Sequence, residues 1–337
     1  MIIEDRIKAF KKLGDFLIGF SDGKLNKDHH LDHIIQASSS YNGWFTSGNI
    51  RSSISAICEN LSADKLTNWV SSYSLPVKQK KNVSIIMAGN IPLVGFNDFL
   101  CVLISGHRAI IKLSSKDNRL FIPIVDELIK IEPRFMNDIK LVEKVEGFDA
   151  VIATGSNESF KHFEYYFKDY PTLLRKSRTS IAILTGEESL EERKALASDI
   201  FLYFGLGCRN VTKLYIPKDY DLNLLFEVFY DYQDVVLNSK YANNYDYFRA
   251  IYMMGNHNIL ENGFLILKED KSLHSPVAVL NYEYYDEKDS LMLQLEELKD
   301  DIQCVVGKGF IPFGKAQHPQ LEDYADGVDT LGFLENI

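Results

Sequence analysis

Cysteine is scarce in this chain of 337 residues. The four that occur, Cys58, Cys101, Cys208 and Cys304, are far apart and form no Cys-x-x-Cys pair. This spacing excludes a disulfide framework and a cysteine-rich zinc site, and it predicts a protein of a reducing compartment with no metal centre.

Positive charge is also in short supply. The chain has 37 Lys and Arg against 47 Asp and Glu, which gives a net charge of -10. Because basic surface supplies most of the affinity for a phosphate backbone, nucleic acid is not an expected partner.

No apolar run is long enough to cross a membrane. The longest apolar region, residues 83–111, is interrupted by Asn90, Pro92, Asn97 and Asp98. It divides into strand, turn, helix and strand, as expected for a buried parallel sheet. The N-terminal segment mixes charges with apolar residues at helical spacing and lacks the continuous apolar core of a signal peptide. We therefore expect an amphipathic first helix and a cytoplasmic protein with no membrane span.

Strand and helix patterns alternate along most of the chain. The first 80 residues are mostly helical in pattern, and strands such as VSIIMA, RAIIKL and DAVIAT then alternate with helices. A second series, with TSIAIL and VTKLYIP, follows a boundary near residues 170–180. Such alternation predicts an α/β fold with mainly parallel sheets covered by helices, in two halves.

The turn after the first strand lacks the Gly-x-Gly-x-x-Gly fingerprint of dinucleotide-binding folds. In its place stands Gly-Asn-Ile-Pro, with Asn90 at the carboxyl edge of the predicted sheet. An amide there can donate a hydrogen bond to a developing oxyanion. Asn before a Pro-containing segment is also typical of a helix N-cap, so both interpretations stay open.

The next strand ends in Lys112, Ser114, Ser115 and Lys116, with no carboxylate before Asp117. NAD-specific folds usually carry an acidic residue here for the ribose hydroxyls, whereas a basic residue accommodates a 2′-phosphate. The pattern favours NADPH over NADH. The alternative is a solvated strand end with capping serines.

A later strand ends in Thr154, Gly155 and Ser156, which open a helix. Backbone N–H groups and a hydroxyl at a helix N-terminus suit a pyrophosphate. The alternative is that Ser156 acts only as an N-cap, with Glu158 in the first turn.

Cys208 follows a pair of glycines, precedes Arg209 and begins a strand pattern. A nucleophile needs room, access and a cation that favours its thiolate, and this setting offers all three. The alternative is a small core residue. Cys101 and Cys304 lie in apolar helix and strand patterns, and we predict that both are buried.

Taken in order, these turns resemble the aldehyde dehydrogenase superfamily, most closely its LuxC-type acyl-CoA reductase branch, which makes fatty aldehydes. The match rests on AGNIPLVGFNDF, GHRAIIKLSSKD, ATGS, FGLGCRNVTKLYIP and the tail IPFGKAQHPQLEDYADGVDTLGFL, within about residues 80–335. The resemblance implies an aldehyde-dehydrogenase-like fold. We expect N-terminal helices and a Rossmann-like NAD(P)-binding domain over 1–177. A catalytic domain follows over 178–312, and a tail over 313–337 packs back on the cofactor side.

The resemblance also implies roles for individual residues. Cys208 matches the nucleophile that takes the acyl group from a thioester. Asn90 and the Cys208 N–H match the oxyanion hole, Lys112 the adenosine-ribose contact, and Ser156 the start of the pyrophosphate-binding helix. An acyl-CoA or acyl-carrier substrate, an acyltransferase or synthetase partner and a homo-oligomer are implied as well.

Two departures from ordinary aldehyde dehydrogenases refine this expectation. Leu174 or a near neighbour stands where hydrolytic members keep the Glu that activates water, which favours reduction of the acyl-enzyme over hydrolysis. Ser272 stands where a Glu usually holds the nicotinamide ribose. Candidate proton donors are His107, His274 and His318.

The predicted function is therefore NADPH-dependent reduction of an acyl thioester to an aldehyde through an acyl-cysteine. A short-chain CoA-acylating aldehyde dehydrogenase and a non-catalytic member of the fold are the alternatives.

Overall fold

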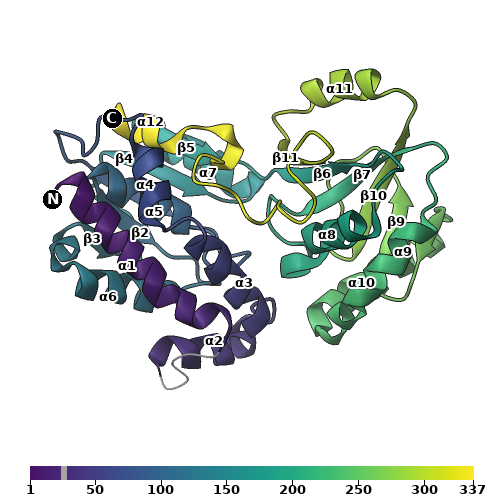
Figure 1. Ribbon diagram of the computed structural model, residues 1–337, viewed down its shortest axis with the longest axis horizontal. Helices are drawn as coiled ribbons and strands as arrows, with labels where there is room; N and C mark the ends of the chain where they lie inside the picture. Colours follow the sequence, from purple (N-terminus) through teal and green to yellow (C-terminus); the bar gives the residue numbers. More distant parts are fainter. Residues whose placement is uncertain (24–28) are drawn as a thin grey trace. The chain divides into compact units, whose positions relative to one another are not determined.

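Figure 1 shows the computed structural model, which describes residues 1–23 and 29–337, with only the backbone of Asn157. The chain forms two compact units. The first contains residues 1–177 and 319–337, and the second contains residues 178–318. Each unit has its own sheet with helices packed against it.

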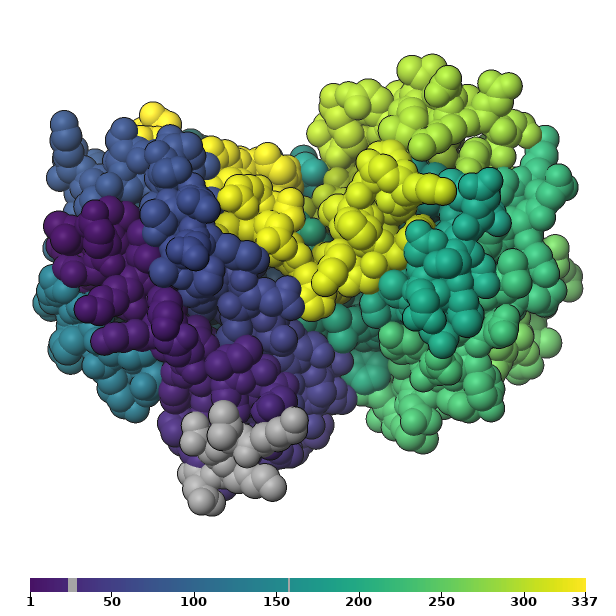
Figure 2. Space-filling model, viewed as in Figure 1, coloured from purple at the N-terminus to yellow at the C-terminus, as the bar shows by residue number. Residues whose placement is uncertain are grey.

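In the described residues, four helices precede the first sheet: α1 (Ile3–Ser21), α2 (His30–Tyr41), α3 (Ser47–Cys58) and α4 (Ala63–Val70). The side chains of Thr46 and Ser62 accept backbone N–H groups of the first turns of α3 and α4, which is why these helices begin where they do. The first helix is amphipathic, as predicted: it buries Phe10, Leu13 and Leu17 in the core of the unit. Figure 2 shows the N-terminal helices, in purple and dark blue, on the visible surface of this unit.

The first sheet is entirely parallel. Its strands are β1 (Asn82–Ile86), β2 (Arg108–Lys112), β3 (Ile139–Leu141), β4 (Ala150–Thr154) and β5 (Thr172–Arg175), in the order β3-β2-β1-β4-β5. The connecting helices are α5 (Phe96–Ser105), α6 (Phe121–Ile131), η1 (Pro133–Asn137) and α7 (Asn157–Phe167). The strand order reverses between β1 and β4, and parallel sheets of this kind bind ligands outside the carboxyl ends at such a switch point.

The C-terminal residues 319–337 pack on the first unit, through η4 (Ala325–Gly327) and α12 (Thr330–Glu335). Trp69 Nε1 donates a hydrogen bond to the Tyr324 hydroxyl at 2.9 Å. Arg175 Nη2 donates to Thr330 Oγ1 at 3.0 Å and to Asp98 Oδ1 at 2.6 Å. These buried contacts join the end of the chain to α4 and β5, and they join β5 to α5.

The second sheet has the order β11-β6-β7-β10-β9-β8, and only β8 runs antiparallel to its neighbour. Its strands are β6 (Thr179–Ile183), β7 (Val211–Pro217), β8 (Ile259–Glu261), β9 (Ile266–Glu269), β10 (Val279–Tyr285) and β11 (Ile302–Gly307). The helices of this unit are α8 (Leu190–Phe201), η2 (Leu202–Gly205), α9 (Asn223–Phe229), η3 (Tyr230–Leu237), α10 (Ser239–Met254) and α11 (Lys288–Glu297). Leu214 and Tyr215, adjacent on β7, belong to different apolar clusters, because successive strand residues face opposite sides of a sheet.

The predicted fold class, two α/β halves with parallel sheets, is confirmed. Some details differ. The helix predicted within residues 83–111 begins at Phe96, and the sequence patterns indicated neither α10 nor α11. Residues 313–318, grouped above with the tail, lie in the second unit. None of the helices in the described part of the chain is both long and apolar enough to span a bilayer.

Candidate functional site

Cys208 lies on a tight turn that leads into the central strand β7. The Asn210 N–H donates to the Gly207 carbonyl at 3.3 Å, which places Cys208 and Arg209 at the two central positions of the turn. Cys208 is partly exposed, whereas Cys101 and Cys304 are buried, as predicted. Cys208 is therefore not a core residue.

The backbone leading to Cys208 is strained. Tyr203, Phe204, Gly205 and Gly207 have φ angles of 55°, 60°, 76° and 99°. Left-handed backbone costs glycine little, but for a bulky aromatic residue it is uncommon. Residues held in such conformations concentrate at functional sites, where the surrounding structure fixes them. The glycines before Cys208 therefore allow the left-handed backbone conformation at positions 205 and 207, in addition to leaving room beside the thiol.

Arg209 is tied to a neighbouring loop of the same unit. Its Nη1 donates to the Ala316 carbonyl at 3.3 Å. That loop is held in turn by Asp199 on α8, whose carboxylate accepts the N–H groups of Gly314 and Ala316 at 2.6 and 3.0 Å. Burial outweighs these two hydrogen bonds and raises the pKa of Asp199 to about 7.

A pocket of about 560 Å³ opens at the carboxyl ends of β1, β2 and β3. Its polar lining includes Lys112, Ser114 and Ser115, so the structure brings these three predicted residues together. Asn118 and Glu143 also line it. The remaining lining is apolar and comprises Ile86, Met87, Ile111, Leu113, Ile122, Leu141 and Val142.

Glu143 was missed from the sequence although a signal existed. It comes shortly after the segment that forms β3, and the carboxyl ends of neighbouring parallel strands lie at the same edge of a sheet. A carboxylate therefore does reach the pocket, but from β3 rather than from β2.

The turn that carries Asn90 packs closely on the turn that carries Ser114. A Cβ atom added to Gly89 would lie 2.6 Å from Ser114 Oγ, so only glycine allows this approach. Asp117 Oδ2 accepts the Leu93 N–H at 2.9 Å, and burial raises the pKa of this carboxyl to about 6.

Asn90 itself is exposed at this edge of the sheet. The following helix, α5, begins at Phe96 with Gly95 as its N-cap residue and no side-chain cap. The interpretation of Asn90 as a helix cap is therefore wrong, and its role as an oxyanion donor stays a prediction.

Thr154, Gly155 and Ser156 lie at the carboxyl end of β4, across the switch point from β1. Ser156 is the N-cap of α7, since its Oγ accepts the Ser159 N–H at 3.3 Å. Capping does not exclude a pyrophosphate contact, which stays a prediction. These three residues do not line the pocket beside Lys112.

His107 is a structural residue. Lys81 N–H donates to His107 Nδ1 at 3.0 Å, so Nε2 carries the proton and donates to the Leu334 carbonyl at 2.8 Å. Burial lowers the pKa of this imidazole. Both ring nitrogens are engaged by backbone groups, so the expectation that His107 donates a proton is wrong.

Leu174 and Ser272 are the residues that the resemblance aligns with glutamates of aldehyde dehydrogenases. Leu174 lies within β5 beside Ala153 of β4, and the adjacent Arg175 is buried against Asp98. Ser272 lies in an exposed loop and donates to the His274 carbonyl at 3.0 Å.

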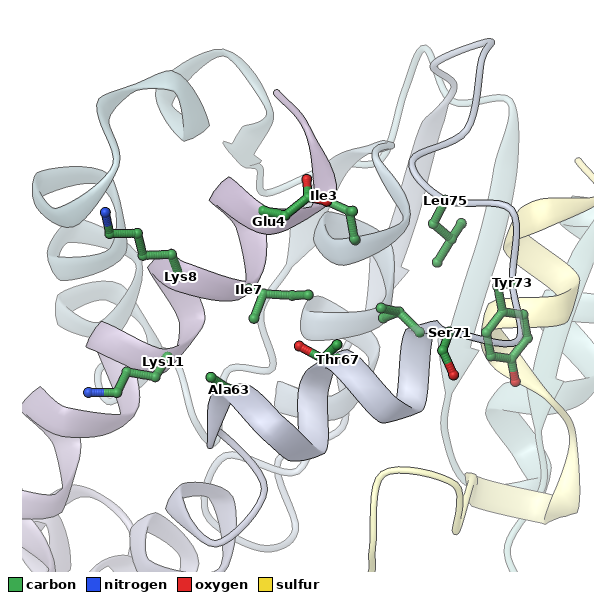
Figure 3. Close-up of a pocket in the computed structure, with 11 residues that line it drawn as sticks. Ile3, Glu4, Ile7, Lys8, Lys11, Ala63, Thr67, Ser71, Tyr73 and Leu75 are labelled. Atoms are coloured by element: carbon green, nitrogen blue, oxygen red, sulfur yellow. The ribbon is translucent and has the colours of Figure 1, made fainter.

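A second pocket, of about 520 Å³, lies between α1 and α4 in the first unit. Figure 3 shows Ile7 on α1 facing Thr67 on α4, while the amines of Lys8 and Lys11 point away from α4. It contains no residue predicted for the site and no nucleophilic thiol.

Comparisons by sequence find no known protein family and no curated protein that match this chain. Solved structures do match. An aldehyde dehydrogenase of Mycobacterium tuberculosis complexed with NAD⁺ has a TM-score of 0.62 at 13% identity, over 91% of this chain and 73% of that one. Aldehyde dehydrogenase 21 of Physcomitrella patens, in complex with the product succinate, has a TM-score of 0.64 at 13% identity and the same coverage.

An acetylating aldehyde dehydrogenase of Geobacillus thermoglucosidasius has a TM-score of 0.60 at 9% identity, over 91% of this chain and 76% of that one. Identities this low establish the fold alone, and they do not single out the LuxC-type branch. The chain has the two-domain fold of the aldehyde dehydrogenases.

Proposed function

We propose that this protein reduces an acyl thioester to an aldehyde with NADPH, through a covalent acyl group on Cys208. The observation that carries the proposal is the partly exposed Cys208 on a tight turn that follows strained backbone and leads into β7, in a chain with the aldehyde dehydrogenase fold. The overall reaction is RCO–SR′ + NADPH + H⁺ → RCHO + NADP⁺ + HSR′.

The first unit has groups that fit a dinucleotide. A pocket of about 560 Å³ lies within the usual range for ligand sites, and its apolar walls suit an adenine ring. Lys112, Ser114 and Ser115 would hold the adenosine ribose and a 2′-phosphate, and the α7 N-terminus at Ser156 would hold the pyrophosphate. When bound, the reduced nicotinamide supplies the hydride for the acyl carbon.

Cys208 performs the covalent chemistry in this proposal. Its thiolate attacks the thioester carbonyl and forms a new S–C bond, and the bond to the departing thiol breaks as that sulfur takes up a proton. The resemblance assigns the hydrogen bonds to the tetrahedral oxyanion to the Asn90 side chain and the Cys208 N–H. After reduction, the thiohemiacetal on Cys208 collapses, the S–C bond breaks, and the aldehyde leaves with regeneration of the thiolate.

The side chain at position 174 supports reduction over hydrolysis. Leu174 cannot accept a proton from water, and Arg175 beside it is committed to Asp98 and Thr330. Without a base at this place, hydrolysis of the acyl-enzyme is slow, and the intermediate survives until hydride transfer.

The test is NADPH oxidation with acyl-CoAs of graded chain length, with the aldehyde trapped and quantified. We expect one aldehyde per NADPH for the wild type and for Cys58→Ser, and no product from Cys208→Ala. The Cys58 thiol is a suitable control because it lies in the first unit, where it donates to the Gly14 carbonyl. Wild-type turnover by Cys208→Ala would overturn the proposal.

A CoA-acylating aldehyde dehydrogenase for short acyl groups is the second candidate. It is favoured by the fold match to a protein described as acetylating. The same chain-length series separates the two, because a short-chain enzyme loses activity as the acyl group lengthens.

A further inference from the structure

Ser180 makes hydrogen bonds to the Cys208 turn from the neighbouring strand β6. Its backbone N–H donates to the Asn210 carbonyl at 3.1 Å, and its Oγ lies 2.9 Å from the Cys208 carbonyl oxygen. The same Oγ lies 3.0 Å from Cys304 Sγ on β11. Ser180 is fully buried, and Cys304 is nearly so.

The chemistry of the groups fixes the direction of these hydrogen bonds. A carbonyl oxygen can only accept, so the Ser180 hydroxyl proton points to the Cys208 carbonyl. The Ser180 oxygen then accepts from Cys304, whose thiol must keep its proton to donate. The result is a chain from Cys304 S–H to Ser180 O–H to the Cys208 carbonyl.

The backbone before the turn is strained at Tyr203 and Phe204, which both have positive φ. Such conformations persist only when neighbouring contacts over-determine them, and the two hydrogen bonds from Ser180 clamp the turn that follows. Ser180 contacts the turn at two carbonyls, those of Cys208 and Asn210. Its hydroxyl thus orients the peptide that follows the reactive sulfur.

We infer that Ser180 is a positioning residue for Cys208, and that the Cys304 thiol supports it. This inference rests on the proposed function, because the position of the Cys208 N–H matters most where an oxyanion develops. Ser180 acts on Cys208 through its main chain. Acyl transfer, which needs the oxyanion hole, should therefore respond to the clamp, whereas simple alkylation of the sulfur should not.

The experiment compares Ser180→Ala with Ser198→Ala. Ser198 provides a partly buried hydroxyl in the same unit, which donates to the Ala195 carbonyl within its own helix α8. In a single turnover with an acyl-CoA, Ser180→Ala should acylate Cys208 about three- to tenfold more slowly than the wild type, the effect of one lost hydrogen bond. Iodoacetamide should alkylate Cys208 at the same rate in all three proteins.

Hydrogen exchange over residues 203–210 supplies a readout that does not depend on the proposed function. We expect faster exchange there in Ser180→Ala and wild-type exchange in Ser198→Ala. Acylation by Ser180→Ala at the wild-type rate would overturn the inference. If the wild type is not acylated at all, the proposed function is wrong. In that case, unchanged hydrogen exchange over residues 203–210 in Ser180→Ala would show that Ser180 does not hold the turn either.

If Ser180→Ala does not fold, substitutions at Cys304 test the same series of hydrogen bonds, from Cys304 through Ser180 to the Cys208 carbonyl. Cys304→Ser keeps a donor for Ser180, so its acylation rate should stay within about twofold of wild type. Cys304→Val removes the donor and should be slower than Cys304→Ser. Equal acylation rates in these two variants would exclude the proposed support by Cys304.

Discussion

The two units both centre on a parallel sheet, but they place their candidate residues at opposite strand ends and in different surroundings. In the first unit, Lys112 and Ser115 are exposed around a pocket at the carboxyl ends of the strands, and Asn90 is exposed at the same edge but does not line that pocket. In the second, Cys208 lies at the amino end of β7, on a tight turn whose Cys208 carbonyl accepts a hydrogen bond from Ser180. Exposed groups around a pocket suit binding, and a fixed turn suits a nucleophile, so changes in the first pocket should alter affinity and changes at the turn should alter rate.

The largest expected contrast is between cysteines. Burial, followed by the charges of Asp15 and Glu59, raises the pKa of Cys58 to about 12, and burial also raises the pKa of Cys101. At pH 8 the thiolate fraction of Cys58 is then roughly 10⁻⁴, so its alkylation should be about a thousandfold slower than that of an ordinary exposed thiol. Native alkylation followed by peptide mapping should label Cys208 first, and initial labelling at Cys58 or Cys101 would break the comparison.

Removal of the Asn90 amide should affect rate and leave the nucleophile intact. We expect Asn90→Ala to lower kcat by roughly 10²- to 10³-fold, because one donor to the oxyanion is lost. Alkylation of Cys208 should not change. The control is Asn68→Ala, an exposed amide on α4 of the same unit, which should keep wild-type kcat. A rise in KM alone, with kcat unchanged, would show that Asn90 only contacts bound substrate.

Carboxylates around the first pocket should set the cofactor preference. Ser115→Glu places a carboxylate beside Lys112, and we expect the Kd for NADPH to rise by about tenfold or more while NADH binding improves. Glu143→Gln removes the carboxylate already present and should tighten NADPH binding by a few-fold. Titration of both reduced cofactors measures the two effects. Tighter NADH than NADPH binding by the wild type would contradict the prediction from Ser115 and Lys116.

Each unit contains a buried carboxyl group that should make the free energy of unfolding depend on pH. Burial raises the folded-state pKa of Asp199 to about 7 and of Asp117 to about 6. In the unfolded chain the pKa of an Asp carboxyl is about 4. Between this pKa and the folded-state pKa, the folded chain binds more protons than the unfolded chain. The contribution of each carboxyl group to the free energy of unfolding therefore falls as the pH rises.

Chemical unfolding measures the free energy of unfolding of the wild type and of Asp199→Asn at each pH. The difference between the two proteins should decline from about pH 4 to about pH 7. For Asp117→Asn, the difference from the wild type should stop declining near pH 6. A difference independent of pH would show that these carboxyls are not desolvated.

Much of the fold followed from local patterns. The buried runs VSIIMA, RAIIKL and VTKLYIP became β1, β2 and β7 because continuous apolar segments bounded by turns favour parallel strands. The helix α10 was not predicted, since SKYANNYDYFRAIYMM shows no strong apolar periodicity and buries only Tyr241 and Tyr245. Such a helix is stabilised mainly by tertiary packing, which the sequence pattern does not reveal.

The site was less accessible from sequence. Lys112, Ser114 and Ser115 could be grouped because they follow one strand, and the pocket confirms that they share a surface. The left-handed backbone of Tyr203 and Phe204 has no sequence signal, since aromatic residues rarely adopt it. Ser180 was treated as an ordinary strand residue, because its partners Cys208 and Cys304 are distant in the chain and meet it only through the strand order β11-β6-β7.

The central claim is that the sulfur of Cys208 takes an acyl group from a thioester. Intact-mass measurement after incubation with an acyl-CoA in the absence of reduced cofactor tests it most directly, with peptide mapping to locate the adduct. We predict one acyl group per chain, on Cys208, removed as aldehyde when NADPH is added, and none on Cys208→Ala. An acyl group of the same stoichiometry on Cys208→Ala, or no adduct on the wild type at any chain length, would contradict it.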